Sequence, residues 1–224
     1  MQPAARLCRF RPAGAFSAVA LLLTLTAAAQ EEKKPAKPES KPETVKATTL
    51  DNLMTAYNGE SNAHARYLAF AKKADEEGYG QVASLLRAAA RSEEIHANNH
   101  AEVIKKIGGT PKADVQKPDV KLTKENVEAA LKGESYERDT MYPDFIKLAK
   151  AEGHKDAVRT FNFSLQAETE HAKLYKEALD NLDAWKVGKK DFFVCPVCGL
   201  TVIKLTFEKC PVCSTPKDKY EKIS

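Results

Sequence analysis

Two pairs of glutamate and histidine recur in the sequence at the same internal spacing. Glu93 precedes His96 by three residues, and Glu168 precedes His171 by three residues. Residues three apart lie on one face of an α-helix, so each pair can direct a carboxylate and an imidazole toward one metal ion. One such pair is common on exposed helices, whereas two pairs in corresponding positions indicate a shared metal site.

Two further glutamates, Glu60 and Glu134, interrupt apolar stripes at helical spacing. Burying an isolated carboxylate is costly, so four glutamates at core-facing positions require a compensating charge. Two Glu-x-x-His pairs and one glutamate from each remaining helix form the ligand pattern of di-iron carboxylate bundles. Glu137, three residues after Glu134, is an additional candidate ligand.

The other ionisable residues near these positions are expected to have structural roles. Glu94 and Glu170 fall off the apolar stripes, so we expect them to be helix-surface carboxylates paired with lysines. His64 is one helical turn after Glu60, and we expect it to pack beside the ligands rather than to bind metal. His100 and His154 are expected at ordinary polar positions, near a helix end and in a loop.

Four of the five cysteines lie near the C-terminus in two Cys-Pro-Val-Cys knuckles, Cys195 with Cys198 and Cys210 with Cys213. Two such knuckles can supply four thiolates at the corners of a tetrahedron. Thiolates suit zinc or iron rather than calcium or magnesium. Disulfide pairing is the alternative in an exported chain, but the spacing favours a metal site.

Apolar residues between positions 48 and 182 recur at helical spacing in four segments, and strand-like runs are scarce before the cysteines. Thr123 is expected to cap the third helix. Pro143 is expected to disturb that helix just after the ligand turn. The predicted breaks are at residues 78–80, 108–111 and 152–154.

The second half of this helical region repeats the first. Glu60 corresponds to Glu134, and Tyr67 corresponds to Tyr142 with an offset larger by one position. Both members of the first Glu-x-x-His pair return as Glu168 and His171, in the same register as the tyrosines. A duplicated helical hairpin predicts two halves that pack about an approximate two-fold axis, with the site on that axis.

The N-terminal residues have the features of an export signal. Residues 1–29 contain three arginines, an apolar run and a series of alanines, so we expect a signal peptide that is cleaved after Ala29. A retained membrane anchor is the alternative, although the run is shorter than the roughly 20 residues that span a bilayer. Residues 30–46 alternate charge with proline and predict a disordered linker. The expected location is therefore exported, in the periplasm.

The formal net charge of the chain is +4, and the predicted signal contains three arginines and no acidic residue. The rest is nearly neutral, which argues against a nucleic-acid partner, and cleavage of the signal would leave no membrane segment. The remaining predicted domains are a four-helix bundle over residues 47–182, a linker over residues 183–191 and a cysteine-rich metal domain over residues 192–224. The predicted fold class is all-α, a four-helix bundle with a small C-terminal β/loop domain.

Several short motifs together make a specific match to one family. They are Tyr57–Ser61, Glu93–His96, Gly133–Glu137, Met141–Pro143, Glu168–His171 and the paired cysteine knuckles. In these motifs the chain resembles rubrerythrins, across residues 48–222. The resemblance implies a ferritin-like di-iron four-helix bundle followed by a rubredoxin-like domain.

The resemblance also implies a role for each candidate ligand. Glu93 and Glu168 would bridge two irons, Glu60 would complete the first iron, and Glu134 with His171 would complete the second.

The first iron would exchange Glu137 for His96 when the pair is reduced, because a ferrous ion has less charge to offset and accepts a neutral imidazole. Tyr67 and Tyr142 correspond to tyrosines that the family places near the irons. Packing in the core is their alternative role.

The activity that the resemblance implies is a di-iron peroxidase of the NADH peroxidase type, which reduces hydrogen peroxide to water and protects against oxidative stress. The iron held by Cys195, Cys198, Cys210 and Cys213 would relay electrons from an external donor. Because the linker is short, we expect that the tail does not reach the di-iron site of its own bundle. The resemblance implies a homodimer in which the tail of one subunit faces the bundle of the other.

Two alternatives remain open from the sequence. The bundle could serve as a ferroxidase or iron-binding protein, or the tail could be a structural zinc ribbon. The loop between the knuckles is slightly short for the family, and Leu200 stands where an aromatic residue usually follows Gly199.

Overall fold

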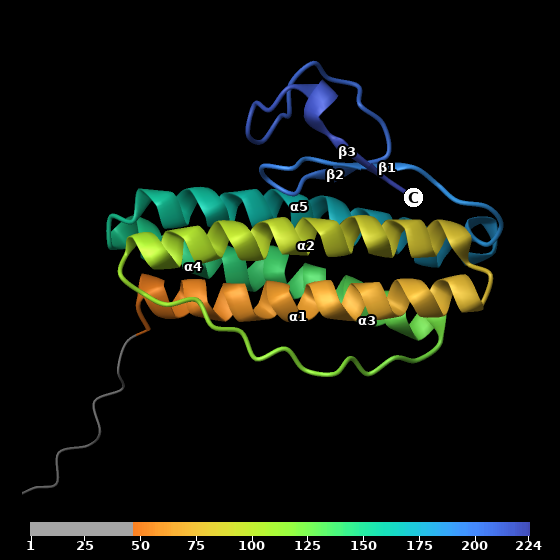
Figure 1. Ribbon diagram of the computed structural model, residues 1–224, viewed down its shortest axis with the longest axis horizontal. Coiled ribbons are helices and arrows are strands. Elements are labelled where there is room, and N and C mark those ends of the chain that lie inside the picture. The colour runs from red at the N-terminus through yellow and green to blue at the C-terminus, as the bar shows by residue number, and fades with distance from the viewer. Residues whose placement is uncertain (1–46) are drawn as a thin grey trace, which may run out of the picture. The chain divides into compact units, whose positions relative to one another are not determined.

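The computed structural model describes residues 47–224, most of which form a bundle of helices (Figure 1). Two successive helices and the short π-helical turn η1 (Glu137–Met141) between them make up the third predicted segment. The predicted fold class is confirmed, whereas the signal and linker predicted for residues 1–46 lie outside the described residues. The helices are α1 (Thr49–Glu76), α2 (Gly80–Lys106), α3 (Thr123–Tyr136), α4 (Tyr142–Ala151) and α5 (Lys155–Asp180).

The turn η1 accounts for the change in offset within the repeat. Seven positions separate Glu60 from Tyr67, but eight separate Glu134 from Tyr142. A π-helical turn accommodates one residue more than an α-helical turn, so Glu134 and Tyr142 are both buried despite the extra residue. Pro143 follows at the start of α4, where its missing N–H is tolerated.

Two glutamates from different parts of the repeat cap the helices of the opposite half. The carboxylate of Glu77 accepts hydrogen bonds from the N–H and the hydroxyl of Thr123, at 2.8 and 2.6 Å. Glu152, its counterpart in the repeat, accepts one from the N–H of Thr49 at 2.9 Å. The expectation that Thr123 is itself the cap was wrong, because it is the first residue of α3 and receives its cap from a distant glutamate.

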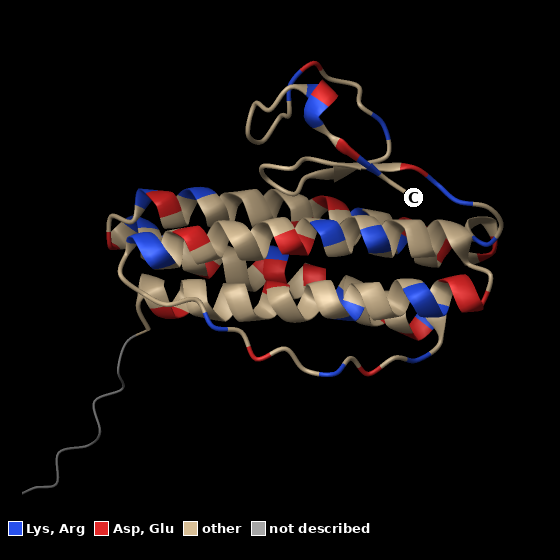
Figure 2. Cartoon of the chain, in the orientation of Figure 1, with Lys and Arg blue, Asp and Glu red and all other residues tan. Residues whose placement is uncertain are grey.

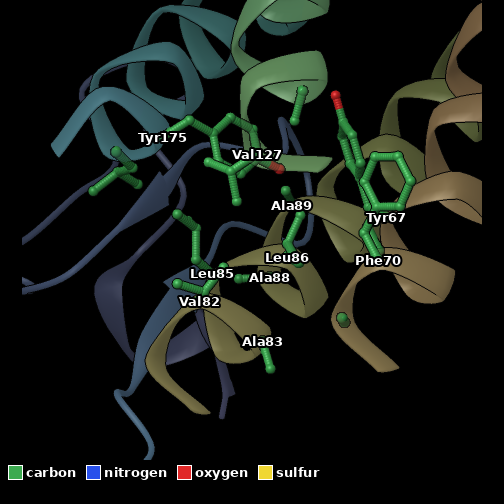
Figure 3. Close-up of a cluster of buried hydrophobic side chains, with 14 of the residues drawn as sticks. Tyr67, Phe70, Val82, Ala83, Leu85, Leu86, Ala88, Ala89, Val127 and Tyr175 are labelled. Atoms are coloured by element: carbon green, nitrogen blue, oxygen red, sulfur yellow. The ribbon is translucent and has the colours of Figure 1, made fainter. Parts of the chain in front are cut away.

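Two clusters of buried apolar side chains fill the bundle, one on each side of its ionisable residues. Figure 3 shows part of the first cluster, in which Tyr67 of α1, Leu86 of α2 and Tyr175 of α5 are close together. The second cluster includes Leu53 of α1 and Ile104 of α2. Along both helices the buried glutamates and histidines lie between the two clusters.

The C-terminal tail contains three short antiparallel strands, β1 (Phe192–Val194), β2 (Thr201–Val202) and β3 (Glu221–Ile223), in the order β2-β1-β3. Each cysteine knuckle turns through a residue with left-handed backbone, Gly199 at φ +78° and Ser214 at φ +64°. These turns bring the two knuckles together beside the sheet.

The tail lies against α2 and α5 of its own chain (Figure 1). Trp185 and Phe192 pack in the same apolar cluster as Leu85 of α2, and the N–H of Gly80 donates to the carbonyl of Lys186 at 2.8 Å. The expectation that the linker would keep the tail away from its own bundle was wrong. The linker begins in a 3₁₀ helix, Leu182–Trp185, and Gly188 has a left-handed backbone at φ +82°, so the chain turns back along the bundle within a few residues.

Charged residues of both signs are distributed over the helices in Figure 2, without a continuous basic stripe on the face shown. This distribution agrees with the near-neutral charge of the chain outside its first 29 residues. Within residues 47–224, no helix is both long and apolar enough to cross a membrane.

Candidate metal centre

Six buried side chains meet in the middle of the bundle in two groups of four. Within each group the ligand atoms lie within 4.8 Å of one another. Glu93 and Glu168 belong to both groups and can therefore contact two ions. The first group is completed by Glu60 and His96, and the second by Glu134 and His171.

The two histidines direct the same ring nitrogen toward the shared carboxylates. His96 Nδ1 lies 3.0 Å from Glu93 Oε2 and 3.0 Å from Glu168 Oε1. His171 Nδ1 lies 2.9 Å from Glu168 Oε2 and 3.4 Å from Glu93 Oε1. This arrangement follows the approximate two-fold symmetry that the repeat predicts.

Several buried atoms of this cluster lack a hydrogen-bond partner among the described residues, as expected of ligands to cations. Glu60 Oε2, Glu93 Oε1, Glu134 Oε2, both carboxylate oxygens of Glu168 and His171 Nδ1 are buried, and within residues 47–224 none makes a hydrogen bond. Buried polar atoms are normally paired, because an unpaired one costs about 1–3 kcal/mol. Metal ions at the two groups would satisfy all of them.

The pKa values show how unfavourable the cluster is without cations. Burial, and then the charge of Glu93, raises the pKa of Glu134 to about 8. The same two causes raise the pKa of Glu60 well above its usual value. Burial lowers the pKa of His96, but the charges of Glu168, Glu93 and Glu60 outweigh it and raise that pKa. Positive charge is therefore needed here, from protons or from metal.

Tyr67 and Tyr142 each hold one of the terminal glutamates. The hydroxyl of Tyr67 donates to Glu134 Oε1 at 2.6 Å, and that of Tyr142 donates to Glu60 Oε1. In both glutamates the hydrogen bond occupies Oε1 and leaves the orphaned Oε2 for a metal. The tyrosines are thus placed to orient ligands as well as to pack in the core.

The tail supplies a partner for the outer ring nitrogen of each histidine. His96 Nε2 lies 3.1 Å from the carbonyl oxygen of Cys198, and His171 Nε2 lies 3.0 Å from the hydroxyl of Thr201. Ser92 donates to the carbonyl of Gly199 at 2.7 Å. A carbonyl that accepts from Nε2–H leaves Nδ1 free for metal, the usual arrangement around ligating histidines.

Glu137 lies outside both groups, and the structure therefore has His96 rather than Glu137 among the clustered ligands. Glu137 is half-buried in η1, and its pKa is raised by burial and by Glu60. His64 is also outside, with Nδ1 2.7 Å from the carbonyl of Ala90. Glu170 pairs with a lysine, Lys173, as expected, whereas Glu94 pairs with an arginine, Arg91.

His100 is not at the ordinary polar position that the sequence predicted. It is fully buried, and its Nε2 lies 3.3 Å from the hydroxyl of Tyr142 and 3.8 Å from Glu60 Oε1. The sequence contained a signal for this position, because His100 is four residues after His96 and thus on the same helix face. His154 occupies a half-buried position just before α5.

The four C-terminal cysteines form a second candidate metal site. All four are free thiols whose sulfur atoms lie within 4.8 Å of one another. Cys195 Sγ is 3.5 Å from Cys213 Sγ, and Cys198 Sγ is 3.6 Å from Cys210 Sγ. A tetrahedron with metal–sulfur bonds of about 2.3 Å has edges of about 3.8 Å, so the cluster matches one thiolate-bound ion.

Comparisons with known proteins agree with both sites. The family model described as Rubrerythrin matches residues 51–179. The chain belongs to the rubrerythrin family. It is 38% identical to Rubrerythrin-2 of Clostridium acetobutylicum over 185 residues, covering 78% of this chain and 96% of the relative. It is 41% identical to nigerythrin of Nitratidesulfovibrio vulgaris over 178 residues, covering 79% and 87%.

A solved structure of nigerythrin, described as fully reduced and all ferrous, is similar in fold. The TM-score is 0.74 at 36% sequence identity, covering 86% of this chain and 98% of that one. The clustered carboxylates and histidines fit the di-iron centre of a rubrerythrin, and the four cysteines fit its Fe(Cys)4 site.

Proposed function

We propose that this rubrerythrin is a peroxidase that reduces hydrogen peroxide to water at the bundle site, with electrons relayed one at a time through the four-cysteine site. The observation that supports this most directly is the position of His96. One nitrogen of its ring faces the shared carboxylates, and the other contacts the backbone of Cys198. A single side chain therefore joins the two metal sites of one subunit.

When bound, the two irons of the bundle supply the electrons that cleave the O–O bond, and the four-cysteine iron restores them. The protein's own groups supply charge and position. Glu60, Glu93, Glu134 and Glu168 contribute four negative charges, which balance two divalent cations when the histidines are neutral. With Glu137 outside the cluster, the arrangement is matched to the reduced state of the centre.

Tyr67 and Tyr142 fix the terminal glutamates, and the tail fixes the histidines, so the ligands are already positioned before metal binds. The apolar clusters on both sides exclude water from the centre. Four thiolates leave a metal no open position, so the tail site suits electron transfer and not substrate binding.

Replacement of Cys210 by serine tests the relay. We expect Cys210→Ser to abolish turnover with an external electron donor while the chemically reduced bundle still reacts once with hydrogen peroxide. Stopped-flow absorption measures both steps. Survival of both in the variant contradicts the relay, whereas loss of both contradicts the division into two sites.

Metal analysis and the visible spectrum of the purified protein separate the alternatives. Ferric thiolate and di-ferric sites absorb visible light, whereas zinc does not. A zinc-containing tail would leave a bundle without its relay. Rapid oxidation of added ferrous ion by oxygen, without preference for peroxide, would indicate a ferroxidase.

The donor, the assembly and the location are also parts of this proposal. We infer an activity of the NADH peroxidase type, with electrons from an external donor. We also infer that the protein is a homodimer, and sedimentation of the purified protein tests the oligomeric state. We also infer export, with cleavage after Ala29, and the N-terminal sequence of the mature protein tests this. The signal lies in residues that the structure does not describe.

A further inference from the structure

His100 belongs to a buried polar chain that the metal groups do not use. Its Nε2 lies 3.3 Å from the hydroxyls of both Tyr142 and Ser164, and its Nδ1 lies 3.1 Å from the hydroxyl of Thr160. Tyr142 in turn donates to Glu60. Each of these side chains is at most 3% exposed. A continuous series of hydrogen-bonding groups therefore runs from a candidate metal ligand to Thr160.

The outer end of this chain opens into a cavity of about 350 Å³. Thr160 lines the cavity together with Asn99 and Arg159 of the bundle and with Val197 and Cys213 of the tail. A water molecule takes up about 30 Å³ of liquid, so the cavity has room for several waters beside polar side chains. Thr160 thus borders both the buried chain and a space that water can occupy.

The donors along the chain can all point inward. A neutral His100 imidazole has one donor and one acceptor nitrogen. If Nε2 carries the proton, it donates toward Tyr142, while Nδ1 accepts from Thr160. Tyr142 then donates to Glu60. Every link is satisfied in this one direction, from the cavity to the metal centre.

The internal repeat shows that this chain exists in one half only. In the register that relates the two Glu-x-x-His pairs, His100 corresponds to Tyr175, Thr160 to Leu85 and Ser164 to Ala89. In that half the Tyr175 hydroxyl has no hydrogen-bond partner within residues 47–224. Figure 3 shows Leu85, Ala89 and Tyr175 in the apolar cluster with Tyr67. Packing and a hydrogen bond to a glutamate do not require the counterparts of His100, Thr160 and Ser164, since Tyr67 has both without them.

We propose that Thr160, His100 and Tyr142 form a proton path from the cavity to Glu60. This inference rests on the proposed peroxidase function, in which one hydrogen peroxide takes up two electrons and two protons and yields two waters. A cavity water donates to Thr160 as Thr160 donates to His100 Nδ1, Nε2 donates to Tyr142, and Tyr142 donates to Glu60. Thr160, His100 and Tyr142 each pass on one proton as they receive another, so their charges do not change. The cavity water is left as hydroxide, and Glu60 receives one of the two protons that the reduction of hydrogen peroxide consumes.

The first test measures the path without turnover. In full-length, zinc-loaded protein labelled with ¹⁵N-histidine, NMR reports the His100 tautomer and the exchange of its ring proton with water. We expect the Nε2–H tautomer in the wild type, and exchange slowed about tenfold or more in Thr160→Val. Valine keeps the shape of threonine and removes only the hydroxyl. Equal exchange in both proteins would overturn the path.

The second test follows the reaction of the reduced, iron-loaded protein with hydrogen peroxide in H₂O and D₂O. We expect Thr160→Val and His100→Leu to slow oxidation by about tenfold to 100-fold and to increase the solvent isotope effect. Tyr175→Phe, at the repeat-related position, is the matched control and should leave the rate within about twofold. Iron content and the di-ferric spectrum show whether each variant retains the centre.

The two tests separate the path from the proposed function. If wild-type protein fails to react with peroxide but Thr160→Val slows ring-proton exchange, the peroxidase function is wrong and the path stands. If peroxide reacts equally fast with wild type and Thr160→Val, and their isotope effects agree, the path is wrong and the function stands. Thr160→Val decides the outcome even if His100→Leu fails to fold.

Discussion

Gly199 is one of the residues at which the tail packs closely against the metal centre. Its backbone has φ +78°, in the region that favours glycine. A Cβ at this position would collide with His96 Nε2 and lie 2.6 Å from Ser92 Oγ. Both the turn of the first knuckle and the contact between the two metal sites therefore require a residue without a side chain.

Replacing Gly199 by alanine is expected to push the tail away from His96. Reduction of the bundle through the tail should slow by about tenfold to 100-fold, since small displacements of reacting groups have effects of this size. Stopped-flow reduction of the four-cysteine iron, followed by reoxidation by the bundle, measures the step. The reaction of the chemically reduced bundle with peroxide is the control and should change little. An unchanged transfer rate would mean that this contact does not carry the electrons.

At the scale of helices, sequence periodicity predicted the elements and the inward glutamates because both follow from local spacing. Glu93 and His96 face one way on any helix, whatever surrounds it. The same reasoning failed for contacts between distant elements. It assigned the cap of α3 to Thr123, although the capping side chain is Glu77. It also assigned His100 to an ordinary polar position near a helix end, because the hydroxyl groups that His100 contacts come from α4 and α5.

The π-helical turn had a sequence signal that local patterns do not reveal. The offset within the repeat grows by one position between Glu134 and Tyr142, and one extra residue in a continuous helix requires a wider turn. Glu137 begins that turn. The carboxylate that the family pattern exchanges with His96 is thus located where the helix departs from regular geometry.

The reciprocal glutamate caps predict a pH-dependent contribution to stability. Hydrogen bonds from Thr123 lower the pKa of Glu77 to about 2. Its contribution should be complete above its usual pKa of 4.5 and should disappear as the pH falls toward 2. We expect Glu77→Ala to lower the free energy of unfolding by about 1 kcal/mol at pH 7 and by progressively less below pH 4.5.

Chemical denaturation of the metal-loaded protein at several pH values measures this difference. Glu76→Ala, at an exposed position one residue earlier, is the matched control and should have a much smaller effect. A Glu77→Ala deficit that stays constant from pH 7 to pH 3 would show that the charge of the cap is irrelevant.

At the scale of the whole molecule, we expect the tail to depend on its metal more than the bundle does. Its strands contain only two or three residues each, and a segment of this size rarely folds without disulfides or metal. We expect a chelator that removes the four-cysteine ion to expose residues 195–220 to protease while α1 to α5 stay resistant. Limited proteolysis and mass spectrometry identify the cuts, and Cys210→Ser should reproduce them without chelator. Simultaneous digestion of the helices would mean that the tail supports the bundle.

The contact between His96 and Cys198 within one chain predicts that electrons pass inside a subunit, even if the protein is a dimer. Two variants separate the routes. Cys210→Ser disables the tail site, and Glu93→Ala removes a ligand shared by both groups of the bundle. If the relay operates within a chain, dimers that contain one subunit of each variant should have no more peroxidase turnover than either variant alone.

Transfer between subunits has the opposite consequence, because an intact tail of one variant would then serve the intact bundle of the other. Each mixed dimer would then contain one intact tail that serves one intact bundle, which is half the number of such pairs in a wild-type dimer. Co-expression with two different affinity tags gives the mixed species, and the visible spectrum of the four-cysteine iron shows that the Glu93→Ala tail is loaded. Recovery of turnover would contradict the intrachain route and favour the domain arrangement that the short linker suggested.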